Sequence, residues 1–66
     1  MPYINLKIST PEPSEAQLRQ VVEEFTDTVA RVLNKNPDDV MVYIDITPPT
    51  ALGFGGKTLQ DIRDGK

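Results

Sequence analysis

The residue types that could do chemistry are few in this chain, and the first of them is a proline at position 2, directly after Met1. No cysteine and no histidine occur among the 66 residues, so disulfides, thiolate nucleophiles and imidazole-based zinc sites are excluded. Near the other end, Gly56-Lys57-Thr58 has the ending of a phosphate-binding loop, but Ala51 stands where that motif needs its first glycine. The sequence therefore predicts no metal site and no phosphate-binding loop.

Charge and hydropathy narrow the range of partners. Seven basic residues against ten acidic ones give a net charge of −3, and the basic residues are scattered along the chain, which disfavours nucleic acid. No segment approaches the ~20 apolar residues of a membrane span, and the N-terminus lacks the basic start and apolar run of a signal peptide. We therefore expect no nucleic-acid partner, no membrane partner and a cytoplasmic location.

Two segments alternate apolar and polar residues, which is the pattern of strands with one apolar face. They cover residues 3–8 and 40–46, and prolines follow both of them. These prolines should end the strands, because proline lacks the N–H donor that a strand interior uses. The apolar face consists of Ile4, Leu6, Ile8, Val40, Val42, Ile44 and Ile46. The opposite face consists of Tyr3, Asn5, Lys7, Met41, Tyr43 and Asp45.

Between these segments the sequence predicts one long amphipathic helix. Ser14 followed by Gln17 is a capping box, in which each side chain accepts a hydrogen bond from an otherwise unpaired backbone N–H. Asn34 tolerates a left-handed C-cap and Pro37 blocks continuation, so the helix should end near residue 34. The apolar positions recur at helical spacing, and they are Leu18, Val21, Val22, Phe25, Val29, Val32 and Leu33.

A strand, a long helix and a second strand predict an α+β chain in which the helix is the crossover between two parallel strands. Residues 51–57 contain three glycines and suit a tight C-terminal hairpin. Residues 58–64 suit a last helical turn that is capped by Thr58. We expect a single domain over residues 1–66.

The predicted unit is too small to stabilise itself easily. A chain of this size buries roughly 60% of its unfolded surface, and a two-stranded sheet with one open face is not stable alone. Because disulfides and a metal site are excluded, association is the remaining way to complete the fold. We expect a homo-oligomer that is built from dimers.

Three segments, in their order and spacing, resemble the 4-oxalocrotonate tautomerase family: Met1-Pro2-Tyr3-Ile4, residues 28–33 before Pro37, and Leu52-Gly53-Phe54-Gly55-Gly56-Lys57. The resemblance covers essentially the whole chain. It implies short β-α-β subunits, usually assembled as hexamers, that need no metal or organic cofactor. It also implies that Pro2, uncovered by removal of Met1, is a general base that moves a proton between carbons of an unsaturated 2-hydroxy or 2-keto acid.

The chemistry implied for Pro2 is physically reasonable. A free α-amino group titrates near pH ~8, partial burial lowers that pKa further, and a base close to neutral suits proton abstraction next to a carbonyl. Two alternatives stay open. Pro2 can simply begin an edge strand, where no N–H donor is needed, and if Met1 is retained the nitrogen of Pro2 is an amide without a basic lone pair.

Two positions depart from the family. Members that act on dicarboxylates hold them with two arginines from neighbouring subunits, whereas this chain has Glu12 in the loop after the first strand and Met41 at the start of the second. Methionine cannot replace the bidentate recognition of a carboxylate by arginine. We therefore expect a more apolar pocket, and a substrate other than the family's standard dicarboxylate.

The resemblance and the open sheet face together predict five substrate-binding residues around Pro2, namely Met41, Tyr43, Leu52, Phe54 and Lys7. Tyr43 is expected to donate a hydrogen bond to a developing enolate oxygen, and Lys7 is the nearest candidate for a positive charge. The alternatives are subunit-interface packing for Met41 and Tyr43, and a solvated surface position for Lys7. The competing function is a non-catalytic subunit that pairs with an arginine-bearing, tautomerase-like chain.

Overall fold

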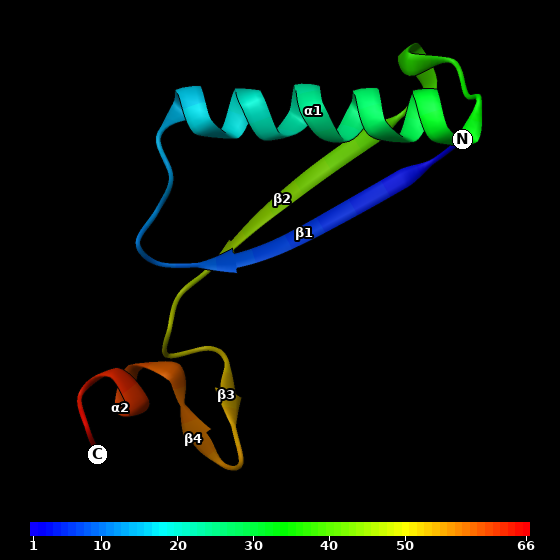
Figure 1. The fold of residues 1–66 in the computed structure, drawn as a ribbon. Helices are drawn as coiled ribbons and strands as arrows, with labels where there is room; N and C mark the ends of the chain where they lie inside the picture. The colour runs from blue at the N-terminus through cyan, green and yellow to red at the C-terminus, as the bar shows by residue number, and fades with distance from the viewer.

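The computed structural model covers residues 1–66 and consists of a β-α-β unit followed by a hairpin arm, residues 48–66 (Figure 1). In chain order the elements are β1 (Tyr3–Ser9), α1 (Glu15–Leu33), the 3-10 turn η1 (Pro37–Asp39), β2 (Met41–Thr47), β3 (Gly53–Phe54), β4 (Lys57–Thr58) and α2 (Leu59–Arg63). The predicted element order is confirmed. Both long strands end one residue later than the alternation predicted, and β2 also begins one residue later.

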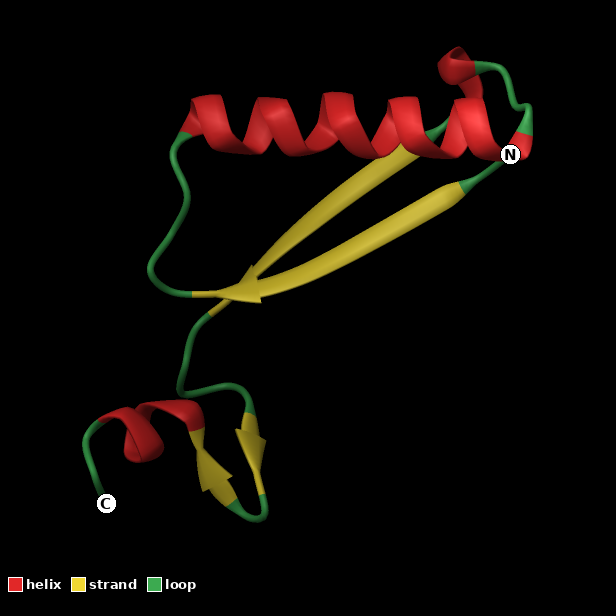
Figure 2. Cartoon of the chain, viewed as in Figure 1, coloured by secondary structure: helices red, strands yellow, loops and turns green.

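β1 and β2 pair in parallel, with α1 as the crossover between them. The register joins Tyr3 to Met41 at one end of the sheet and Ser9 to Thr47 at the other. Figure 2 shows α1 lying over one face of this two-stranded sheet, while no element of the chain covers the other face. The sheet is therefore open on the side that carries the odd-numbered strand residues.

Local hydrogen bonds fix both ends of α1. Ser14 Oγ accepts the Gln17 N–H at 3.1 Å, and Gln17 Oε1 accepts the Ser14 N–H at 2.9 Å, so the predicted capping box is confirmed. Asn34 takes the left-handed conformation with φ 55° and donates its N–H to the carbonyl of Ala30. The helix ends where the sequence predicted, because asparagine tolerates this cap better than most residues.

The hairpin of β3 and β4 depends on three glycines. Gly55 and Gly56 form its turn with φ of 58° and 88°, values that favour glycine in two-residue hairpins. Gly53 is needed for a different reason, because a Cβ at this position would overlap the carbonyl of Lys57 across the hairpin. The Thr58 side chain then caps α2, as the sequence predicted.

The core of the isolated chain is incomplete. No residue is buried, and the strand residues that face α1 are only half-buried. The apolar stripe of α1 is broader than the sheet that it covers, because a sheet of two strands is only about 10 Å wide. The helix residues that remain exposed are Val22, Phe25, Val32 and Leu33.

The overall shape is extended. The radius of gyration is 15.3 Å, whereas a compact chain of this length has about 11 Å. The accessible surface is 5037 Å², against about 4,200 Å² for a compact protein of this mass. Figure 1 shows the reason, since the hairpin arm projects beyond the carboxyl end of the sheet and does not fold back over it.

Replacing Ser14 with alanine removes the hydroxyl that accepts the Gln17 N–H, so we expect the free energy of unfolding to fall by about 1 kcal/mol. The measurement is urea denaturation at one fixed protomer concentration, because association shifts apparent stability. Ser14→Thr is the matched control, since it keeps a hydroxyl at the cap. Equal stability of Ser14→Ala and the parent chain would contradict the prediction.

Candidate functional site

Pro2 lies directly before β1, at the amino end of the parallel sheet. Its carbonyl accepts a hydrogen bond from the backbone N–H of Met41 at 3.0 Å, which holds Pro2 beside the first residue of β2. Met1 extends beyond the sheet and is 96% exposed. Met1, whose removal would uncover the nitrogen of Pro2, is therefore open to solvent in the single chain.

Three cross-strand pairs cross the open face, namely Tyr3 with Met41, Asn5 with Tyr43, and Lys7 with Asp45. The pair nearest Pro2 is apolar and aromatic, and the pair nearest the carboxyl end is charged. Lys7 Nζ donates to Asp45 Oδ2 at 2.9 Å, and Asn5 Nδ2 donates to the same oxygen at 3.0 Å. Tyr43 and Met41 are each nearly half exposed, at 48% and 46%. The face therefore offers apolar contacts at one end and an ion pair at the other.

The ion pair shifts the pKa of both partners. The hydrogen bond from Asn5, followed by that from Lys7, lowers the pKa of Asp45 below its ordinary value of 3.8. The hydrogen bond to Asp45, followed by its negative charge, raises the pKa of Lys7 above 10.5. Both groups are therefore ionised at neutral pH, and their charges cancel.

A hollow of about 370 Å³ lies at the carboxyl ends of β1 and β2. We call it the carboxyl-edge hollow, and its lining residues are Lys7, Ile8, Ser9, Thr47, Ala51 and Leu52. Ser9 Oγ donates to the carbonyl of Thr47 at 2.7 Å and joins the two strand ends. The structure thus brings together two of the predicted site residues, Lys7 and Leu52.

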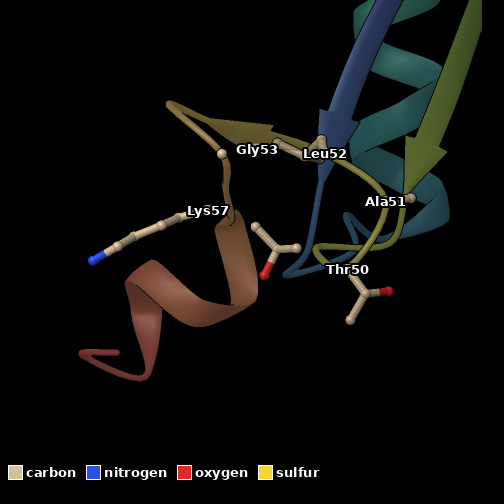
Figure 3. A pocket seen from close by; sticks show the side chains of 7 residues that line it. Thr50, Ala51, Leu52, Gly53 and Lys57 are labelled. Carbon is tan, nitrogen blue, oxygen red and sulfur yellow. The ribbon is translucent and has the colours of Figure 1, made fainter.

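A second hollow, of about 380 Å³, lies within the hairpin arm (Figure 3). Its lining residues are Thr50, Ala51, Leu52, Gly53, Gly56, Lys57 and Thr58. Leu52 and Ala51 line both hollows, so the two are adjacent. The Lys57 side chain extends away from this hollow in Figure 3 and donates to the main-chain oxygen of Lys66 at 3.0 Å.

The predicted site residues do not converge within one chain. Pro2 lies beside Met41 at the amino end, whereas Lys7 and Leu52 meet at the carboxyl end. Pro2 and Lys7 are five positions apart, which corresponds to about 17 Å along a strand. Phe54 lies further out on β3 and is 67% exposed. A small acid therefore cannot contact both Pro2 and Leu52 of the same chain.

One polar contact of the arm was not predicted from the sequence. Arg63 Nη1 donates to Thr10 Oγ1 at 2.9 Å, and Arg63 Nη2 donates to the Thr10 carbonyl at 2.6 Å. These bonds hold the end of α2 against the loop that follows β1. No sequence pattern links these two residues, which lie 53 positions apart.

Two further features bear on partners. Neither helix combines the length and the apolar character that crossing a bilayer requires. Acidic side chains form no group of three or more that could hold a metal ion. A third hollow, of about 540 Å³, lies on α1 away from the predicted site residues, and its lining residues are Glu15, Leu18, Arg19, Val22 and Glu23.

The fold agrees with what comparison with known proteins finds. The sequence model of the family described as "Tautomerase enzyme" matches residues 2–62, from Pro2 to the last turn of α2. The chain belongs to this tautomerase family. A protein of Helicobacter pylori strain J99 that is named a probable tautomerase is 36% identical, over 96% of both chains.

Solved structures give the same result for the fold. The crystal structure of DmpI from Helicobacter pylori superposes with a TM-score of 0.85 at 32% identity, over 96% of this chain and 97% of that one. A 4-oxalocrotonate tautomerase isozyme from Methylibium petroleiphilum superposes with a TM-score of 0.88 over 98% of this chain and all of that one. Its 23% identity carries the fold alone.

The pKa shifts of Asp45 and Lys7 predict how stability depends on pH. Because the pKa of Asp45 is lowered, its contribution is present above 3.8 and is lost as the pH falls through its folded-state pKa. Because the pKa of Lys7 is raised, its contribution is present below 10.5 and is lost as the pH rises through its folded-state pKa. Asp45→Asn should therefore destabilise the chain slightly between these values, since the pair is exposed, and lose its effect outside them.

The measurement is the urea midpoint of Asp45→Asn and of the parent chain over a pH series at one protomer concentration. Asp27→Asn is the matched control, since Asp27 pairs with Arg31 at a longer distance of 3.7 Å on the exposed surface of α1, where such pairs contribute little. A difference between Asp45→Asn and the parent that does not change with pH would exclude the ion pair as its cause.

Proposed function

We propose that this protein is an isomerase that transfers a proton between carbons of an unsaturated 2-hydroxy or 2-keto acid, with the nitrogen of Pro2 as general base. The observation that carries the proposal is the tautomerase family match that begins at Pro2. Position 2 becomes an N-terminal secondary amine when Met1 is removed, and Met1 is exposed. Tautomerase activity is the function that this family membership supports.

The chemistry needs only the amine and a dry pocket. A free α-amino nitrogen has a pKa near ~8, so part of it is unprotonated at neutral pH and accepts a proton from the substrate. The same nitrogen then returns that proton to a different carbon, which leaves the composition of the substrate unchanged. The proposal therefore includes no metal and no organic cofactor.

The site is proposed to lie between copies of this chain. Pro2 and Leu52 lie at opposite ends of β1, so the Pro2 of one copy must approach the carboxyl-edge hollow of another if both are to contact one substrate. Association would also cover the open sheet face and the exposed apolar residues of α1. A homo-oligomer that is built from dimers, with a hexamer as the size that the family resemblance implies, satisfies both requirements.

The proposed pocket is mainly apolar. Met41, Leu52 and Phe54 supply its walls, and the Tyr43 hydroxyl would donate a hydrogen bond to the enolate oxygen that forms as the proton leaves carbon. Lys7 would attract the carboxylate of the substrate. Support for this arrangement comes from the exposure of Met41, Tyr43 and Phe54 and from the shared hollow of Lys7 and Leu52.

The mechanism predicts that an uncapped Pro2 is essential. A chain with a short N-terminal extension should have no tautomerase activity, because the nitrogen of Pro2 is then an amide, and cleavage that leaves Pro2 first should restore it. Pro2→Ala should lower kcat/KM for phenylpyruvate or 2-hydroxymuconate about 10²-fold, which is typical of a displaced general base. Intact mass shows whether Met1 has been removed. Full activity of the extended chain would exclude the mechanism.

Assembly is tested separately by light scattering on the purified chain. We expect a particle of several chains at micromolar concentration, because a single chain has no buried residue and a two-stranded sheet is unstable alone. A folded monomer at that concentration would exclude a site shared between copies.

A second function is supported by one observation, which is that Glu12 and Met41 occupy the positions of the two family arginines. In this case the chain is a non-catalytic subunit that pairs with an arginine-bearing tautomerase chain. This second function predicts that the chain purified from its native cell keeps Met1 and has tautomerase activity only when mixed with that partner. Removal of Met1 together with Pro2-dependent turnover by the chain alone would exclude this function.

A further inference from the structure

We propose that Asp45, through its ion pair with Lys7, makes the site select substrates with a single carboxylate and an apolar tail over matched dicarboxylates. The inference rests on the proposed function, since it concerns the carboxyl-edge hollow as part of the substrate site. Lys7 is the residue that binds the carboxylate, and Asp45 is a positioning residue that does not line the hollow.

The first step is the number of substrate carboxylates that the cationic residues of the hollow can bind. Lys7 is the only charged residue among its six lining residues. An ammonium group has three donors, and one of those on Lys7 is engaged by Asp45 Oδ2 at 2.9 Å. The remaining donors suffice for one carboxylate. The apolar residues among the six are Ile8, Ala51 and Leu52.

The second step is the effect of Asp45 on a second negative charge. The Asp45 carboxylate stays ionised, because both Asn5 and Lys7 donate to it. It balances the charge of Lys7, so Lys7 can hold one carboxylate through its free N–H donors, but the pair has no net positive charge with which to stabilise a second carboxylate. A second carboxylate would then lie either among apolar side chains without a partner or near Asp45, and both placements are unfavourable.

The third step concerns a second cation of the hairpin arm, which is Arg63. Both terminal nitrogens of its guanidinium donate to Thr10, at 2.9 and 2.6 Å, and Arg63 does not line the carboxyl-edge hollow. It therefore serves to hold the hairpin arm against the loop after β1 and leaves carboxylate binding to Lys7. Glu12 in that same loop adds another negative charge on this side of the molecule.

Binding of two inert acids tests the inference without any turnover. Sorbate and trans,trans-muconate share one diene chain and differ only in a terminal methyl group against a second carboxylate. Calorimetry on the assembled protein should give sorbate an affinity at least about tenfold higher than that of muconate, because the second carboxylate of muconate has no cationic partner. Lys7→Met should lose sorbate binding and Lys7→Arg should restore it. Lys35→Met, at an exposed site after α1, should change nothing.

Asp45→Asn keeps the shape of the side chain and removes its charge. We expect it to reduce the difference in affinity between sorbate and muconate. We also expect it to lower KM for 2-hydroxymuconate relative to KM for the monocarboxylate analogue 2-hydroxyhexa-2,4-dienoate, while kcat changes little. If Asp45 had a purely structural role, the substitution would instead change KM for both substrates by the same factor. Unaltered selectivity in Asp45→Asn would overturn the inference, as would loss of sorbate binding in Arg63→Gln but not in Lys7→Met.

The two proposals fail in different ways. If Pro2→Ala keeps full activity, the proposed function fails, whatever the affinities of the two acids. If turnover depends on Pro2 but muconate binds as tightly as sorbate, the proposed function stands and the selectivity assigned to Asp45 and Lys7 is wrong.

Discussion

A sheet of two strands is about 10 Å wide, and in this chain one helix covers only one of its faces. The narrow sheet and the single covering helix both limit how much apolar surface the chain can bury. The helix carries a broader apolar stripe than the sheet can cover, so Phe25, Val32 and their neighbours stay exposed, and the opposite sheet face has no cover at all. The result is a chain with regular secondary structure, well-formed caps and no interior. What the chain lacks is a partner surface, and its own copies are the partner that we propose.

The same geometry separates the chemical groups. Pro2 stands at the amino end of β1, and the cation Lys7 stands near the carboxyl end beside Leu52. Between them the open face changes from apolar and aromatic pairs to a neutralised ion pair. A reaction that needs a base in a dry environment and one carboxylate contact can use this arrangement only when the two ends belong to different chains. Association and chemistry are then consequences of one feature, the parallel pairing of two short strands.

Local chemistry made most of the fold predictable from the sequence. The capping box of Ser14 and Gln17, the left-handed cap at Asn34 and the turn glycines each specify backbone geometry within a few residues. The contacts of Lys7 with Asp45 and of Arg63 with Thr10 were not predicted, because they depend on strand register and on the course of the arm. For the same reason the sequence did not show that Pro2 and Met41 lie at one end of the sheet and Lys7 and Leu52 at the other.

The outline of the chain, 47 × 25 × 14 Å, also governs how a dissociated subunit would move in solution. Frictional drag depends on shape as well as on mass, and an elongated particle diffuses more slowly than a sphere of equal volume. A free subunit would therefore pass through a sizing column ahead of globular standards of its own mass. Elution volume by itself confuses a lone elongated chain with a compact pair, so a dissociation constant that is read from column profiles alone would be systematically wrong.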